Sequence, residues 1–166
     1  MKNWSIKKII KEIVTTLLMV FVISMVLNYI RKPDSANNQL SDLNVSLISG
    51  QQVSLMGKDK PIVIHFWATW CPTCKLEAPN LETIKDKAHL ISVAVNSGSD
   101  SELRAFMKER GYSYNVVNDN EGKLSDKFGV EVFPTTFIYD AKGTLEFLEV
   151  GYSSAFGLKA RLALVR

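Results

Sequence analysis

Hydrophobic and polar positions predict strands and helices in alternation from about residue 61 onward. Residues 61–67 form a nearly continuous apolar, β-branched and aromatic run, typical of a strand buried on both faces of a sheet. After this run, Leu76, Leu81 and Ile84 recur at a helical spacing. The later predicted elements are a strand over 89–95, helices over 101–110 and 120–128, a hairpin of strands 135–139 and 145–150, and a helix from about 153 to 164. This order predicts an α/β sandwich built on one mixed sheet.

The first 32 residues follow a different pattern. Residues 13–30 contain eighteen residues without a charge, and at about 1.5 Å each they nearly span a hydrocarbon core about 30 Å thick. The segment therefore predicts one transmembrane helix. Four lysines and one glutamate precede it, whereas Arg31, Lys32 and Asp34 follow it. The positive-inside rule then places the N-terminus in the cytoplasm and the rest of the chain outside.

A cleavable signal peptide is the alternative interpretation of this segment. Its apolar region should span about 7–15 residues and end in a small-x-small cleavage site. The sequence over 28–33, Asn-Tyr-Ile-Arg-Lys-Pro, contains no such site, so an uncleaved anchor is favoured. We expect a cytoplasmic N-terminus and anchor over 1–32, a polar linker over 33–41 and one globular domain over 42–166.

Charge is distributed unevenly between these parts. The 166-residue chain has a formal net charge of +3, but residues 1–32 carry six Lys or Arg and a single Glu. The remainder holds fourteen Lys or Arg and sixteen Asp or Glu, so the basic character belongs to the anchor. No basic run interleaved with aromatic residues occurs in the predicted domain, and nucleic acid is therefore not an expected partner.

The predicted domain holds the only two cysteines of the chain, Cys71 and Cys74, in a C-x-x-C between the first strand and the first helix. Such a pair indicates either a redox couple or half of a metal site, and we favour the redox couple. At the helix N-terminus, free N–H groups and the positive end of the helix dipole stabilise a thiolate at Cys71. Pro72 occupies a position where its missing N–H is not needed. Cys71 is the predicted nucleophile, and Cys74 the thiol that resolves a mixed disulfide.

Two segments of the chain resemble the thioredoxin family: 66–75, Phe-Trp-Ala-Thr-Trp-Cys-Pro-Thr-Cys-Lys, and 132–137, Val-Phe-Pro-Thr-Thr-Phe. The resemblance covers about residues 40 to 166. It implies a thioredoxin-like fold, a mixed central sheet flanked by helices, and no organic cofactor. It also implies a cis peptide bond before Pro134, which faces the cysteines. The implied groove for a protein substrate is formed by Trp70, Pro72, Thr73, Phe133 and Pro134.

Three features are similar to one bacterial branch of this family. Glu77 and Pro79 extend the motif to C-x-x-C-x-x-E-x-P, residues 112–130 add length, and residues 43–55 predict a hairpin that turns at Ser49-Gly50. The membrane-anchored branch that contains TlpA, ResA, DsbE and the copper-sensitivity suppressor ScsD shares these features. The resemblance implies a protein anchored in the bacterial inner membrane by residues 13–30, with its redox domain in the periplasm.

Two ionisable residues near the cysteines have open roles. His65 stands where thioredoxin carries a buried aspartate, and Glu77 lies one helical turn beyond Cys74. His65 either shuttles the proton that resolution by Cys74 requires or is a core histidine bonded to the backbone. Glu77 either exchanges protons with Cys74, as the matching glutamate is thought to do in the family, or is a solvated helix charge.

Metal-binding functions compete with the redox interpretation. Structural zinc prefers four ligands, yet the sequence offers only the two cysteines, His65 and His89, with both histidines on predicted strands. Two thiolates suit Cu(I), so a periplasmic copper-handling protein is the alternative function. We favour a thiol–disulfide oxidoreductase whose partners are protein clients and a membrane redox partner. The sequence leaves its direction open between a reductant, as in cytochrome c maturation, and an oxidant.

Overall fold

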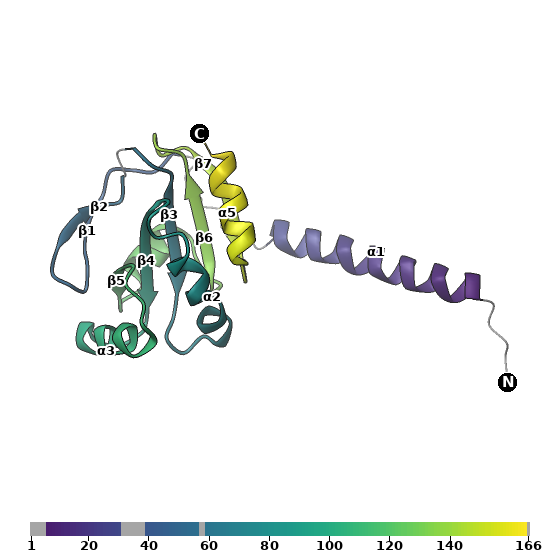
Figure 1. Cartoon of the computed structure of the whole chain (residues 1–166), viewed down its shortest axis with the longest axis horizontal. Helices are drawn as coiled ribbons and strands as arrows, with labels where there is room; N and C mark the ends of the chain where they lie inside the picture. The colour runs from purple at the N-terminus through teal and green to yellow at the C-terminus, as the bar shows by residue number, and fades with distance from the viewer. Residues whose placement is uncertain (1–5, 31–38, 57–58, 166) are drawn as a thin grey trace. The chain divides into compact units, whose positions relative to one another are not determined.

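A five-stranded sheet with the strand order β5-β4-β3-β6-β7 positions the cysteine pair (Figure 1). β3 (Ile62–Trp67) pairs in parallel with β4 (His89–Val95), which pairs in parallel with β5 (Asn115–Asp119). On its other side β3 pairs antiparallel with β6 (Thr135–Tyr139), and β6 pairs antiparallel with β7 (Leu145–Val150). Every residue of the central strand β3 is buried, which explains why its sequence is apolar except at His65. The predicted mixed sheet is confirmed.

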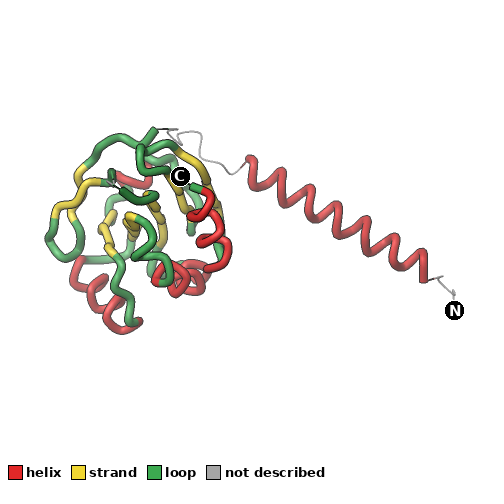
Figure 2. Tube along the Cα trace, turned by 45° about the horizontal axis from the view of Figure 1, so that its top comes forward, coloured by secondary structure: helices red, strands yellow, loops and turns green. Residues whose placement is uncertain are grey.

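Helices and a hairpin cover the two faces of this sheet (Figure 2). One face packs with α2 (Pro72–Glu82), α3 (Asp100–Arg110) and α5 (Ala155–Leu164) around a core that contains the odd-numbered residues of β3. The opposite face, with the even-numbered residues, packs with α4 (Lys123–Lys127). It also packs with the hairpin whose strands are β1 (Asn44–Ser46) and β2 (Gln52–Ser54). Alternation along β3 therefore supplies both cores.

The computed structural model describes residues 6–30, 39–56 and 59–165. The chain divides into two compact units, Met1–Lys32 and Pro33–Arg166. Most of the predicted linker, 33–38, lies outside the described residues. Leu40, which we also assigned to the linker, is buried, and its N–H donates to the Gly143 carbonyl oxygen at 2.7 Å. The folded unit thus includes this end of the predicted linker.

The first unit contains a single described helix, α1 (Ile6–Ile30). It includes the apolar segment 13–30, although the side chains of 21 and 24–30 lie outside the described residues. Among the residues that can be described, no helix has both the length and the apolar character required of a membrane span. The transmembrane role of residues 13–30 stays a prediction.

Two elements differ from the sequence-based prediction. The helix expected over 120–128 is confined to α4, because Gly122 adopts a left-handed conformation with φ of 74° immediately before it. The strand β5 was not predicted. Its apolar content is limited to Val116 and Val117, flanked by asparagines, so no periodic pattern is visible. Pairing with β4 and the bridge from Leu47 to Val117 place this short segment in the sheet.

Candidate active site

The two cysteines form a disulfide where β3 ends and α2 begins. Cys71 is the N-cap of α2, and its sulfur accepts a hydrogen bond from the Cys74 N–H at 3.2 Å. Pro72 follows as the first helical residue, as predicted. Both cysteines are largely covered, with exposed fractions of 5% for Cys71 and 1% for Cys74. The attacking position is thus the more accessible one, and the helix N-terminus favours a thiolate there.

The loop before β6 approaches this disulfide from the neighbouring strand. The Phe133–Pro134 peptide bond is cis, as expected, and the Phe133 carbonyl oxygen lies 3.8 Å from Cys71 Sγ. Pairing between β3 and β6 begins only at Thr135, so the Phe133 backbone lies outside the ladder. A backbone segment in this position is available to an extended peptide, which adds to it as a strand.

Trp70 forms one wall beside the Phe133 loop. Its side chain is 59% exposed, and its indole N–H donates to the Asn96 carbonyl oxygen at 3.0 Å. The Trp70 and Phe133 rings meet edge to face with centroids 5.9 Å apart. Pro72 and Thr73 are exposed between the cysteines. All five predicted substrate-binding residues therefore lie around the disulfide. Trp70, Pro72 and Thr73 are exposed, Phe133 is half-buried and Pro134 is buried.

His65 lies within the sheet, on the face that carries α2. It is 1% exposed, and its Nδ1 is 2.9 Å from the Thr136 hydroxyl. Burial lowers the pKa of His65 to about 3, because the protonated ring would lose its hydration. The ring is therefore neutral around pH 7. The partner is a side chain on β6 rather than the backbone that one of our two interpretations assumed.

Glu77 is a fully buried carboxyl one helical turn beyond Cys74 on α2. Neither of its oxygens has a regular hydrogen-bond partner among the described residues. Burial raises the pKa of Glu77 to about 8; the Ser153 backbone N–H acts in the opposite direction, and the charge of Glu149 adds to the rise. This excludes the solvated-charge interpretation. The side chain is a neutral acid near pH 7, on the same face of the helix as Cys74.

Some contacts of the site were missed because they join distant segments. Thr136 is 71 residues from its partner His65, and Asn96 is 26 residues from Trp70. Thr136 had one local signal, since it lies two residues after Pro134, which the resemblance places against the cysteines at the end of β3. The Asn96 contact uses a backbone carbonyl, which is independent of side-chain type, so no sequence pattern indicates it.

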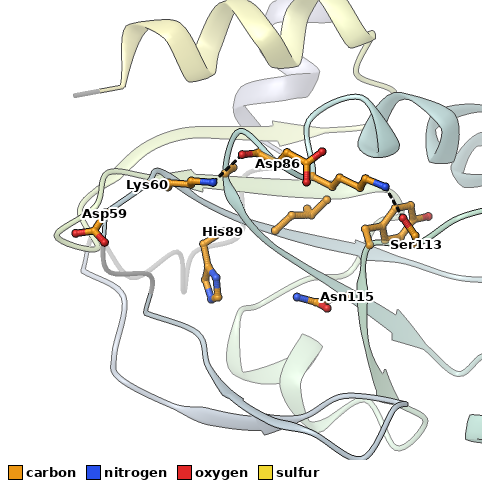
Figure 3. Close-up of a pocket in the computed structure, with 10 residues that line it drawn as sticks. Asp59, Lys60, Asp86, His89, Ser113 and Asn115 are labelled. Atoms are coloured by element: carbon orange, nitrogen blue, oxygen red, sulfur yellow. Dashed lines mark hydrogen bonds between the residues drawn. The ribbon is translucent and has the colours of Figure 1, made fainter.

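A separate surface pocket of about 550 Å³ lies at the end of the sheet opposite to the cysteines (Figure 3). It surrounds the first residues of β4 and β5, whereas Cys71 follows the last residue of β3. Two of its polar side chains are engaged within the fold: Lys60 Nζ donates to the Asp86 carbonyl oxygen at 2.8 Å, and His89 Nε2 is 2.9 Å from the Ser54 carbonyl oxygen. This pocket is distinct from the redox site.

Residues 36–148, which include the disulfide and the Phe133 loop, match the family model described as "AhpC/TSA family". The chain belongs to this family. Its relatives include a "Thioredoxin-like protein" of Haemophilus influenzae, which is 28% identical over 95% of this chain and 95% of its own length.

Two further relatives carry more specific names. The "Thiol-disulfide oxidoreductase ResA" of Bacillus subtilis is 34% identical, and the match covers 66% of this chain and 62% of that protein. The solved structure of StoA from Bacillus subtilis is 26% identical, with a TM-score of 0.65 over 73% of this chain and 96% of that one. These relatives confirm the resemblance to the ResA branch and the thioredoxin-like fold. This member of the family is accordingly a protein thiol–disulfide oxidoreductase.

Proposed function

We propose that the protein is a membrane-anchored periplasmic enzyme that exchanges disulfides with protein clients through Cys71 and Cys74. The observation that carries this proposal is the position of Cys71 Sγ, at the N-terminus of α2 and 3.8 Å from the Phe133 carbonyl oxygen. A client that adds as a strand beside Phe133 has its own sulfur directed to Cys71. The helix N-terminus keeps the attacking sulfur reactive.

In the reducing direction the Cys71 thiolate attacks a client disulfide, and one client sulfur leaves as a thiolate. Cys74 then loses its proton and attacks Cys71 Sγ, which releases the second client thiolate and forms the Cys71–Cys74 disulfide. Two electrons pass from the cysteine pair to the client. The oxidising direction is the same sequence in reverse.

Glu77 is the stronger of the two proton-handling candidates. It is buried one turn from Cys74, and a pKa of about 8 lies close to that of a thiol, so proton exchange between them is nearly balanced. His65 has a pKa of about 3 and keeps its neutral form when neighbouring thiols titrate. We assign His65 a positioning role, in which its bond to Thr136 joins β3 to the strand that follows the Phe133 loop.

The anchor and the location rest on the sequence. Residues 13–30 carry no charge, and four lysines precede them. We expect full-length protein to stay in the membrane pellet after carbonate washing, and protease added on the periplasmic side to digest the redox domain. Recovery of a shortened soluble chain that begins near Asn37 would show that residues 13–30 are a cleaved signal peptide.

Replacement of the resolving cysteine tests the enzymatic roles. Cys74→Ala should accumulate mixed disulfides between Cys71 and its clients, because capture proceeds and release does not. Cys71→Ala is the matched control and should capture none. Trapping by Cys71→Ala alone would reverse the assignment. The reduction potential then gives the direction: a value of about −270 mV favours a reductant, and one of about −120 mV favours an oxidant.

A further inference from the structure

Three exposed apolar side chains lie beside the redox site where α2 and α5 pack together. Leu76 is 72% exposed, Tyr152 is 55% exposed and Phe156 is 83% exposed. We call these three residues the α2–α5 patch. None of them contributes to the disulfide or to the Phe133 loop. Large apolar side chains that gather on one part of a surface are typical of an interaction site.

Hydrogen bonds from α2 to the segment before α5 hold the patch together. Asn80 Nδ2 donates to the Tyr152 hydroxyl at 3.2 Å and to the Ser153 carbonyl oxygen at 2.9 Å. Leu76 precedes Asn80 by four residues, so both lie on the same side of α2. Phe156 follows Ser153 by three residues, in the first turn of α5. The three apolar side chains thus surround one fixed junction.

The α2–α5 patch is continuous with the Phe133 loop. The Gly151 N–H donates to the Pro134 carbonyl oxygen at 2.8 Å, and Tyr152 is the next residue. The redox site therefore has apolar walls on two sides. Trp70 and Phe133 form one of them, and the patch forms the other.

We propose that the α2–α5 patch binds an apolar side chain of an extended client, a few residues away from the cysteine that reacts with Cys71. This inference rests on the proposed function and names the class of client. Leu76 lies five residues beyond Cys71, a rise of about 7–8 Å along the helix. An extended peptide advances about 3.3 Å per residue, so this rise corresponds to two or three residues, and an anchor up to four residues from the client cysteine lies within side-chain reach of the patch.

The size of the patch favours a peptide segment over a second copy of the chain. A large side chain buries about 150–250 Å², and because only 72%, 55% and 83% of these three side chains is exposed, their complete burial removes on the order of 500 Å² at most. A stable dimer buries about 800 Å² on each partner, and the patch falls below that area. One aromatic or aliphatic anchor, in contrast, needs a surface of this size.

Two matched peptides test the proposal with the full-length reduced protein. Each peptide carries one cysteine as a mixed disulfide with glutathione. The first peptide has phenylalanine at the positions four residues before and four residues after the cysteine, and the second has serine at the same positions. Exchange reduces this disulfide to peptide thiol and glutathione, while Cys71 and Cys74 are oxidised to their disulfide. In a single turnover, the release of peptide thiol gives the second-order rate constant, and glutathione disulfide serves as a substrate without an anchor.

We expect the second-order rate constant to be about fivefold higher or more for the phenylalanine peptide. Phe156→Ser and Leu76→Ser should remove most of this preference and leave the rate with glutathione disulfide unchanged. Leu164→Ser is the matched control, because Leu164 is 71% exposed on the same helix, about 12 Å farther along it. This control variant should keep the full preference.

An unchanged preference in both patch variants would overturn the proposal. The proposal would also be overturned if the preference for the phenylalanine peptide persisted while Phe156→Ser changed the sedimentation mass or weakened binding to phosphatidylglycerol vesicles. The patch would then bind a second copy of the chain or a lipid surface. These results leave disulfide exchange itself intact. A wild-type protein that reduces neither peptide nor glutathione disulfide would instead refute the proposed function.

Discussion

Replacing Glu77 with glutamine should stabilise the folded protein at neutral pH. Burial holds the pKa of this carboxyl at about 8 in the folded state, against an ordinary value of 4.5. Between these two values the folded protein binds a proton that the unfolded chain has released. The free energy of unfolding therefore falls as the pH rises through this window. The Glu77→Gln substitution keeps the shape of the side chain and removes the titration.

The size of the effect follows from the two pKa values. At pH 7 the unfolded carboxyl is almost fully ionised and the folded one is mostly protonated, which corresponds to about 3 kcal/mol. The full difference, approached above pH 8, is about 5 kcal/mol. Small domains have a total unfolding free energy of about 5–15 kcal/mol. The variant should thus match the wild type near pH 4.5 and exceed it by about 3 kcal/mol at pH 7.

Urea unfolding of the disulfide form at a series of pH values measures this difference. His65 acts in the opposite direction below pH 6.5, but its contribution is common to both proteins and cancels in the comparison. Glu82→Gln on the same helix is the control, and its effect on the unfolding free energy should have the opposite sign. Burial alone would raise the pKa of Glu82, but hydrogen bonds from Lys85 and Ser113 outweigh it and lower the pKa. That variant should lose stability relative to wild type as the pH rises.

A difference between Glu77→Gln and wild type that is the same at pH 5 and at pH 8 would refute the reasoning. It would show that Glu77 ionises in the folded state with an ordinary pKa. Loss of stability at pH 8 would be a stronger contradiction, because it would require a buried carboxylate with favourable partners.

Two further predictions concern the sheet. His65→Asn should remove an acid-side loss of stability: the folded pKa of His65 is lowered to about 3 from 6.5, so the unfolding free energy of the wild type should fall by about 2 kcal/mol relative to that of the variant between pH 7 and pH 5, with the contribution of Glu77 common to both proteins; a difference between the two proteins that stays constant over this range would contradict the burial argument. Phe137→Ala should lower the unfolding free energy by about 3–5 kcal/mol, because Phe137 is fully buried against Phe66 and Phe128; a loss below about 1 kcal/mol in a urea titration would show that the core closes around the cavity.

The sequence predicted the elements whose burial follows a simple rule. β4, β6 and β7 have the predicted bounds. β4 and β6 are buried along their length and are rich in apolar and β-branched residues, whereas β7 is a partly buried edge strand whose start follows from the glycine-containing turn after β6. The N-cap position of Cys71 was predictable for a similar reason, since strand, cysteine and proline are adjacent in the sequence. Local chemistry was sufficient in these cases.

The remainder depended on contacts between distant residues. β5 is stabilised by β4 and the hairpin rather than by its own short apolar sequence. Nothing around Glu77 in the sequence indicates that its carboxyl is buried, because Ser153 and Glu149 lie more than seventy residues away. The α2–α5 patch could not be predicted for the same reason, because it joins residues that are far apart in the sequence. Leu76 fits an apolar helix face with Leu81 and Ile84 by its spacing, yet it is 72% exposed.

The pairing of β3 with β6 has a consequence for biosynthesis. His65 and Thr136 are neighbours across this pair but are 71 residues apart in the chain. Closing so long a loop makes the pair a late event in folding. A nascent chain therefore exposes Cys71 and Cys74 before the Phe133 loop and the segment around Tyr152 have been synthesised. During that interval the cysteine pair is a simple dithiol, and it acquires selectivity for its clients only when the last fifth of the chain has joined the sheet.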